Sequence, residues 1–408
     1  MKRFPILLAA GLLVASCVSA KPPKKTRTVT ILHFSDYHSH AVPFYAEGRN
    51  DTGGIARAIG YLRPLSKRDD TLIFSGGDMM NRGAPSWSDR YTCTEWSWLN
   101  GIVDAMAFGN HDADYGPEEF QRCRGTIDYP ILSANLLDGN GKPVFKTNGK
   151  RYAVFTRNGI RIGVFALAGL DFQTLLKKAN SPVPNVRVGD PIATAREVVA
   201  QLRQLEHADA VIMIGHEQLE DDIALAKAVP GIDVIFGTHS HRKRDIGMIE
   251  GADATWIISP FQYLTYISRV QLNFDCGTSP CRFTGLSGGL VTMDGKVPED
   301  SGTRARVARM QKELELDPKY AKLFRPIGTI PSELSTEGQF ERDSSLGDFA
   351  TDVMRAAAGT DAALATASSF REPIPPGVVT GERLRAALPY PNKILTFSLP
   401  GSTLQSIL

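Results

Sequence analysis

The sequence predicts an α/β fold with two domains. Its 408 residues exceed what one hydrophobic core usually serves. Short apolar runs typical of buried strands alternate with helical patterns such as Ile55 to Lys67 and Ile192 to Glu206. Five of the apolar runs lead into glycine or polar residues whose side chains can bind metal. Because ligands collect where strands end in sheets with helical crossovers, these residues indicate one shared site.

The first twenty residues predict an export signal. Residues 1–3 are Met-Lys-Arg, and an apolar run follows over residues 6–14, too short to span a bilayer. Residues 14–17 resemble a bacterial lipobox, in which Cys17 would be acylated and anchor the protein to a membrane. Residues 18–20, Val-Ser-Ala, would also serve as an ordinary cleavage site, so both alternatives stay open. Residues 21–27 predict a flexible tether, and we expect a periplasmic or outer-membrane protein of a bacterium.

Charge and cysteine content narrow the class of protein. A net charge of +2 gives no indication of a nucleic-acid partner. With Cys17 set aside, four cysteines remain, an even number suited to disulfides in an oxidising compartment. We predict the pairs Cys93–Cys123 and Cys276–Cys281, because local closure is the simplest connectivity. A zinc site made of these thiols is the alternative, although neither pair has a two-residue spacing.

The first apolar run with polar residues at its end covers Thr28 to Phe34. It is followed by Asp36 and His38, and residues two apart on a strand point to the same face. Both side chains can therefore converge on one ion, and a solvated turn is the alternative. His40 fits better in the loop that follows.

Two further runs end in the same way. Residues 71–74 lead into Gly-Gly and Asp78, and glycines let the backbone approach a charged centre closely. The Asp78 carboxylate can bridge two cations, and capping a helix is the alternative. Residues 105–108 lead into Gly-Asn110-His111-Asp, in which the Asn oxygen can bind a cation and the His can reach what that cation holds. An ordinary turn is the alternative.

The last two runs end in histidines. Residues 210–214 precede Gly-His216, and residues 232–236 precede Gly-Thr-His239-Ser-His241. Asp, His and Asn are ligand types that hold zinc, manganese or iron rather than calcium. The predicted ligand set is Asp36, His38, Asp78, Asn110, His216, His239 and His241.

In chain order the motifs are Asp-x-His, Gly-Gly-Asp, Gly-Asn-His-Asp, Gly-His and Gly-Thr-His-x-His. Over residues 28–290 this series resembles the calcineurin-like metallophosphoesterase superfamily, specifically the exported 5′-nucleotidase and UDP-sugar hydrolase family. The resemblance implies a four-layer α-β-β-α domain over residues 28–294 and two divalent cations, zinc or manganese. One cation would be held by Asp36, His38 and His241, the other by Asn110, His216 and His239, with Asp78 bridging. His241 stands where relatives often have Gln or Asn, which leaves the metal's identity open.

The constellation implies phosphoester hydrolysis. Two cations about 4 Å apart can share a hydroxide for in-line attack on phosphorus and draw charge from the phosphoryl oxygens. His111 is suited to protonate the leaving oxygen or steady the developing charge, and we expect Asp112 to orient it. A purely structural hydrogen-bonding role is the alternative for both residues.

The composition changes after Asp294. Residues 295–325 predict a linker in which Ser301 to about Phe324 forms one long, mostly exposed helix that bridges two domains. Residues 326–408 resemble the first part of the family's α+β C-terminal nucleotide-binding domain. The helical pattern after Gly401 stops after two turns, so we expect this domain to be incomplete.

Three residues match the nucleotide-contacting positions of that domain. They are Arg342, Arg371 and Tyr390. Arg offers a planar fork to phosphate, and Tyr offers a flat face for a base. A solvated arginine or a core tyrosine is the alternative for each. The family's Gly-rich stretch appears here as Thr-Ala-Ser-Ser over residues 366–369, which makes close backbone approach to a ligand less easy.

We therefore predict a two-metal 5′-nucleotidase that releases phosphate from nucleoside monophosphates. Within the superfamily, the alternatives are a cyclic-nucleotide phosphodiesterase, a UDP-sugar hydrolase or a thiosulfohydrolase. From another class, the alternative is a non-catalytic metal-binding lipoprotein. The expected partner is a nucleotide or another phosphate ester, and the oligomeric state stays open.

Overall fold

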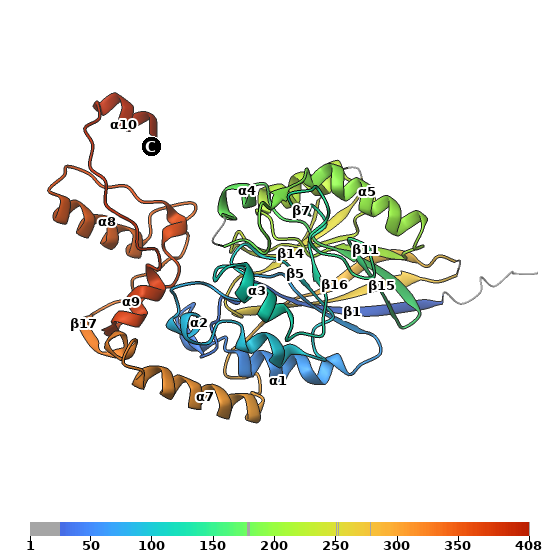
Figure 1. Ribbon diagram of the computed structural model, residues 1–408, viewed down its shortest axis with the longest axis horizontal. Coiled ribbons are helices and arrows are strands. Elements are labelled where there is room, and N and C mark those ends of the chain that lie inside the picture. The colour runs from blue at the N-terminus through green and yellow to red at the C-terminus, as the bar shows by residue number, and fades with distance from the viewer. Residues whose placement is uncertain (1–24, 178–179, 250, 252, 278, 408) are drawn as a thin grey trace, which may run out of the picture.

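A computed structural model describes residues 25–407 except 178, 179, 250, 252 and 278. The predicted export signal and residues 21–24 of the tether lie outside the described residues. None of the helices that the structure describes is long and apolar enough to cross a membrane. Figure 1 shows a layered domain with a smaller C-terminal unit, coloured orange to red, at one side.

The first sheet carries three of the five motif-bearing strands. Its order is β16-β15-β1-β4-β5-β6. The bounds are β1 (Thr26–Phe34), β4 (Thr71–Ser75), β5 (Ala105–Ala107), β6 (Ile131–Leu132), β15 (Tyr266–Asp275) and β16 (Arg282–Thr292). Strands β1, β4 and β5 are parallel, so their carboxyl ends lie at one edge of the sheet. Asp36, Asp78 and Asn110 follow these ends.

The second sheet carries the other two motif-bearing strands. Its order is β13-β14-β12-β11-β9-β8. The bounds are β8 (Ala153–Arg157), β9 (Ile160–Phe165), β11 (Ala210–Met213), β12 (Val234–Phe236), β13 (Lys243–Ile249) and β14 (Thr255–Pro260). Strands β9, β11, β12 and β14 are parallel. His216 and His239 therefore leave the sheet at a common edge.

The two sheets pack face to face and helices cover their outer faces. Alternate β1 residues such as Ile31 join Ile212 and Val234 of the other sheet in one fully buried cluster. Helices α1 (Ile55–Ser66) and α3 (Pro117–Arg124) pack on the first sheet. Helices α5 (Pro191–Gln204) and α6 (Leu219–Ala228) pack on the second. The expected four-layer arrangement is confirmed (Figure 1).

Shorter elements and two disulfides complete this domain. The elements are β2 (Phe44–Ala46), β3 (Arg49–Thr52), α2 (Ser86–Tyr91), η1 (Thr94–Leu99), β7 (Leu136–Leu137), α4 (Phe172–Leu175) and β10 (Arg187–Val188). The disulfides are Cys93–Cys123 and Cys276–Cys281, so the predicted pairing is confirmed.

The long linker helix is shorter than predicted. Helix α7 covers Ser301–Leu316, and a separate turn of 3₁₀ helix, η2 (Ala321–Phe324), follows. The prediction of one helix to Phe324 was wrong because Asp317 precedes Pro318, and a residue before proline is disfavoured in helical conformation. The buried stripe of α7 packs with α1 in the core of the first domain. This stripe is Val307, Met310 and Leu314.

The C-terminal unit is small and mixed. Strands β17 (Pro326–Ile330) and β18 (Gly377–Thr380) form an antiparallel pair. The helices are α8 (Ser345–Ala358), η3 (Ala367–Ser369), α9 (Gly381–Ala387) and α10 (Gly401–Ile407). Leu346, Phe370 and Ile374 form its buried centre.

Candidate active site

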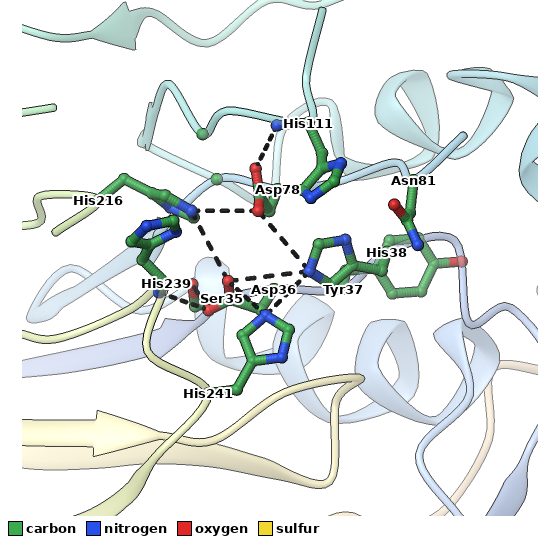
Figure 2. Close-up of polar contacts among 12 residues, drawn as sticks. Ser35, Asp36, Tyr37, His38, Asp78, Asn81, His111, His216, His239 and His241 are labelled. Atoms are coloured by element: carbon green, nitrogen blue, oxygen red, sulfur yellow. Dashed lines mark hydrogen bonds and ion pairs between the residues drawn. The ribbon is translucent and has the colours of Figure 1, made fainter. Parts of the chain in front are cut away.

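Six of the seven predicted ligands, which come from both sheets, converge on one point (Figure 2). Ligand atoms of Asp36, His38 and His241 lie within 4.8 Å of one another, as do those of Asp78, His216 and His239. The two groups adjoin. His216 Nε2 lies 3.1 Å from an Asp78 oxygen and 3.7 Å from an Asp36 oxygen.

Three buried side-chain atoms of the predicted ligands make no hydrogen bond within the part of the chain that the structure describes. They are Asp36 Oδ1, Asn110 Oδ1 and His216 Nε2. An unpaired buried polar atom is costly, and native structures rarely keep one without a reason. Carboxylate, amide oxygen and imidazole nitrogen are ligand types that suit zinc or manganese. The donor set therefore fits divalent cations, which would satisfy all three atoms.

The backbone is strained at most of the predicted metal-ligand residues. Five of the seven predicted ligands have φ between 46° and 58°, in the left-handed region that disfavours residues other than glycine. They are Asp36, His38, Asp78, His239 and His241. Such conformations cost about 1–3 kcal/mol each and gather at functional sites, where the surrounding structure imposes them.

Two glycines allow the ligand loops to touch. A Cβ on Gly109 would lie 2.2 Å from Asp78 Oδ1, and a Cβ on Gly76 would lie 2.2 Å from Thr238 Cγ2. Any larger residue would push these loops apart. The Gly-Gly-Asp and Gly-Asn-His motifs therefore need glycine for close backbone approach.

Backbone carbonyls fix two of the ligand histidines. His38 Nδ1 lies 3.2 Å from Met80 O, and His216 Nδ1 lies 2.7 Å from Gly76 O. Each Nδ1 must carry the proton to donate it, which leaves Nε2 free to bind a cation. Both Nε2 atoms face the carboxylates of the centre.

Electrostatics favour positive charge at the centre. Burial acts to lower the pKa of His216, but the carboxylates of Asp78 and Asp36 raise it to about 10. His241 behaves differently, because burial and the nearby Arg371 lower its pKa to about 4. The buried carboxylates thus attract a proton or a cation to the centre, whereas His241 stays neutral.

His111 lies beside the centre and pairs with Asp114. Its Nδ1 is 2.7 Å from Asp114 Oδ2, and its ring packs edge-on against His38 at 5.2 Å. Burial acts to lower the pKa of His111, but the charges of Asp114 and Asp78 raise it. His111 is therefore positioned to hold a proton and to release it toward the centre.

Asp112 has a different role from the predicted one. Its carboxylate accepts hydrogen bonds from the backbone N–H groups of Gly109 (2.8 Å), Met79 (2.7 Å) and Asp78 (3.1 Å). Burial and the charge of Asp78 raise its pKa to about 8. The prediction that Asp112 orients His111 is corrected, because Asp112 fastens two ligand loops together. Asp114, three residues after His111, holds the His111 ring instead. This His-x-x-Asp spacing is visible in the sequence.

Of the three predicted nucleotide contacts, the structure brings two together. Arg371 Nη1 lies 2.7 Å from His241 Nδ1, and Arg371 Nε lies 3.0 Å from the Tyr390 hydroxyl. Among the described residues, no contact joins Arg342 to the centre. Its side chain is 67% exposed and pairs with Glu337.

A cavity of about 900 Å³ opens between the two domains beside His241 and Arg371. Five aromatic side chains line it, namely Phe44, Phe261, Tyr263, Phe340 and Phe370. The Arg242 guanidinium lies over the Phe340 ring at 5.4 Å. The domains also meet through His40 Nε2 and Glu372 Oε1, 2.7 Å apart. Sequence reasoning missed Glu372, because a contact across 332 residues leaves no local pattern.

Comparison with known proteins places the chain in a family. The calcineurin-like phosphoesterase model matches residues 29–243, and the 5′-nucleotidase C-terminal domain model matches residues 326–408. Protein UshA of Yersinia enterocolitica is 26% identical over 436 residues, covering 94% of this chain and 76% of its own. The 5′-nucleotidase of Vibrio cholerae is 24% identical, covering 97% and 78%.

Solved structures share the fold. The 5′-nucleotidase precursor from Thermus thermophilus superposes with a TM-score of 0.73 at 24% identity, covering 89% of this chain and 74% of that one. The first family model alone spans more than half of the 408 residues. The chain therefore belongs to the calcineurin-like phosphoesterase family of metal-dependent phosphoester hydrolases and carries a 5′-nucleotidase C-terminal domain.

Proposed function

We propose that this protein is a 5′-nucleotidase that releases phosphate from nucleoside monophosphates. The observation that carries the proposal is a cluster of candidate cation ligands, with a His–Asp pair beside it, at the wall of an interdomain cavity of about 900 Å³. A nucleoside fits this volume, and the aromatic lining suits a base. The name of the Vibrio cholerae relative agrees with this substrate.

The ligand set would hold two cations, zinc or manganese. Asp36, His38 and His241 would bind one, and His216 and His239 would bind the other together with the buried oxygen of Asn110, with Asp78 between them. When bound, such a pair lowers the pKa of water and draws charge from phosphoryl oxygens.

The chain's own residues would complete the chemistry. His111, held by Asp114, donates a proton to the oxygen that leaves phosphorus. Arg371 lies beside His241 and offers its guanidinium fork to phosphate oxygens. Tyr390, whose hydroxyl accepts a hydrogen bond from Arg371, would offer a ring face to the nucleoside.

One alternative substrate has an observation in its favour. Arg242 and Lys243 line the cavity directly after His241, where they can meet a second phosphate. The cavity also approaches the upper size of small-molecule pockets. A nucleotide sugar such as UDP-glucose is therefore the second candidate.

We also propose export to the periplasm. The first twenty residues support this through their signal pattern, and two disulfides support it because they persist in oxidising compartments. Acylation of Cys17 would add a lipid anchor, and mass spectrometry of the mature N-terminus would test it.

Product analysis tests the substrate. The protein is chelated, reloaded with zinc or manganese, and given AMP, UDP-glucose, a cyclic nucleotide and an aryl phosphate. Free phosphate is measured for AMP and the aryl phosphate, whereas UMP with glucose 1-phosphate and the nucleoside monophosphate are measured for UDP-glucose and the cyclic nucleotide, because their cleavage frees no phosphate. Metal-dependent hydrolysis with AMP preferred supports the proposal. Hydrolysis of the aryl phosphate alone would mean that the C-terminal unit does not select nucleotides, and no turnover with two metals bound would reject the proposal.

A further inference from the structure

We infer that Asp171 is a positioning residue for the second cation: it holds the His239 ring so that Nδ1 faces the centre. The inference rests on the dinuclear centre proposed above. Asp171 lies before helix α4, in a stretch that carries none of the predicted ligand motifs.

The geometry fixes which nitrogen of His239 is free. Asp171 Oδ2 lies 2.8 Å from His239 Nε2. A carboxylate accepts hydrogen bonds, so Nε2 must be the nitrogen that carries the proton. The lone pair of the neutral ring then sits on Nδ1, which becomes the atom available to a cation.

His239 differs in this respect from His38 and His216. His38 and His216 donate from Nδ1 to backbone carbonyls and so present Nε2. His239 is held at Nε2 by a side chain and presents Nδ1. The backbone contacts cannot be removed by substitution, whereas the contact to Asp171 can.

Asp171 is itself held in place. Its Oδ2 also accepts a hydrogen bond from Gln218 Nε2 at 3.1 Å, and its side chain does not cap α4. The next residue, Phe172, packs edge-on against the rings of His216 and His239 at 5.7 and 5.6 Å. The turn that starts α4 therefore supports both histidines of the second group.

Asp171 acts on the centre through His239 rather than as a ligand. Its carboxylate is not part of the group formed by ligand atoms of Asp78, His216 and His239. A carboxylate behind a ligand histidine sets the tautomer and orientation of the ring, and its loss typically weakens metal binding 10–100-fold. Asp171→Ala should weaken the binding of one cation by about that factor and leave the affinity for the other unchanged.

The test is a titration of the chelated protein with Zn²⁺ or Mn²⁺ in competition with a chromophoric chelator. Asp171→Asn keeps an oxygen that accepts from Nε2–H, so it should restore much of the affinity that Asp171→Ala loses. Gln218→Ala should give a smaller loss of the same kind. At saturating Mn²⁺ the kcat of Asp171→Ala should approach that of the wild type, because the residue touches no substrate.

Asp221→Asn is the matched control. Its carboxylate also feels the charge of His239, yet no hydrogen bond joins the two among the described contacts. Thermal unfolding of each chelated variant checks that the fold is kept.

The inference would be overturned if Asp171→Ala bound both cations as tightly as the wild type. It would also be overturned if Asp221→Asn lost as much metal affinity as Asp171→Ala. Fewer than two cations in the wild type would overturn it together with the dinuclear centre. Two cations in the wild type without phosphate release would reject the proposed function alone.

Discussion

Asp114 Oδ2 lies 2.7 Å from His111 Nδ1, and the same oxygen accepts the backbone N–H of Arg82 at 2.9 Å. The carboxylate is thus fixed from one side by the backbone and holds the imidazole from the other. His111 Nε2 remains as the atom that can deliver a proton. The proposed proton donor therefore lies outside the proposed ligand set, so the two can be perturbed independently.

His111→Ala should keep both cations and slow the chemical step by about 10²–10⁴-fold, because it removes only an acid or electrostatic group. Metal content by elemental analysis and single-turnover phosphate release would measure the two effects. A variant that also loses metal would show that His111 belongs to the ligand set.

Asp114→Ala and Asp112→Ala should fail in different ways. Loss of Asp114 releases His111, so turnover should fall while metal stays, and the double variant with His111→Ala should be no slower than His111→Ala alone. Loss of Asp112 frees the ligand loops that its carboxylate ties together, so metal affinity should fall. Equal metal affinity in both variants would contradict these separate roles.

Asp78→Asn should abolish turnover and weaken the binding of both cations, because the Asp78 carboxylate is expected to bridge them. Its oxygen lies near both groups, 3.1 Å from His216 Nε2 and 3.7 Å from His38 Nε2. Titration with Mn²⁺ would measure both affinities. Near-normal activity would remove the bridging assignment.

Arg371→Ala should lower kcat/KM for AMP by about 10–100-fold, the loss expected for a charge-assisted contact worth about 1.5–3 kcal/mol. Arg371→Lys should restore part of this, because it keeps the charge and loses the fork. Arg342→Ala is the control and should change kcat/KM by less than about twofold, since its side chain is 67% exposed and pairs with Glu337. A loss with Arg342→Ala equal to that with Arg371→Ala would show that Arg342 also contacts the substrate.

Glu95 should make stability depend on pH. Burial raises the pKa of Glu95 to about 7, although hydrogen bonds from Trp87 and Tyr37 act to lower it. The folded protein therefore binds this proton more tightly than the unfolded chain. The resulting stabilisation is complete below the unfolded pKa of about 4.5 and is lost as the pH rises through 7, a change of about 3 kcal/mol.

Urea unfolding of chelated wild type and Glu95→Gln at pH 5 and pH 8 would measure this change. The free energy of unfolding of the wild type, relative to that of the variant, should be lower at pH 8 than at pH 5. A difference between the proteins that does not change with pH would contradict the raised pKa.

The sequence by itself determined where the motif-bearing strands lie, the order of the motifs that follow them, and the chemical types of the predicted metal ligands. Alternating apolar residues and terminal glycines are local properties, and parallel strands bring their carboxyl ends to one edge whatever the detailed packing. Asp36, Asp78 and His216 could therefore be predicted to meet. The disulfide pairs followed from cysteine number and spacing, for the same local reason.

Only the tertiary structure decided which side chains pair around the ligands. Asp112 and Asp114 are both within three residues of His111, and their directions depend on backbone angles and on packing against the Asp78 loop. The Asp171–His239 contact joins residues 68 positions apart, so no local spacing reports it. A local pattern specifies the chemical type of a residue, whereas its hydrogen-bond partner depends on chain segments that meet only when the protein folds.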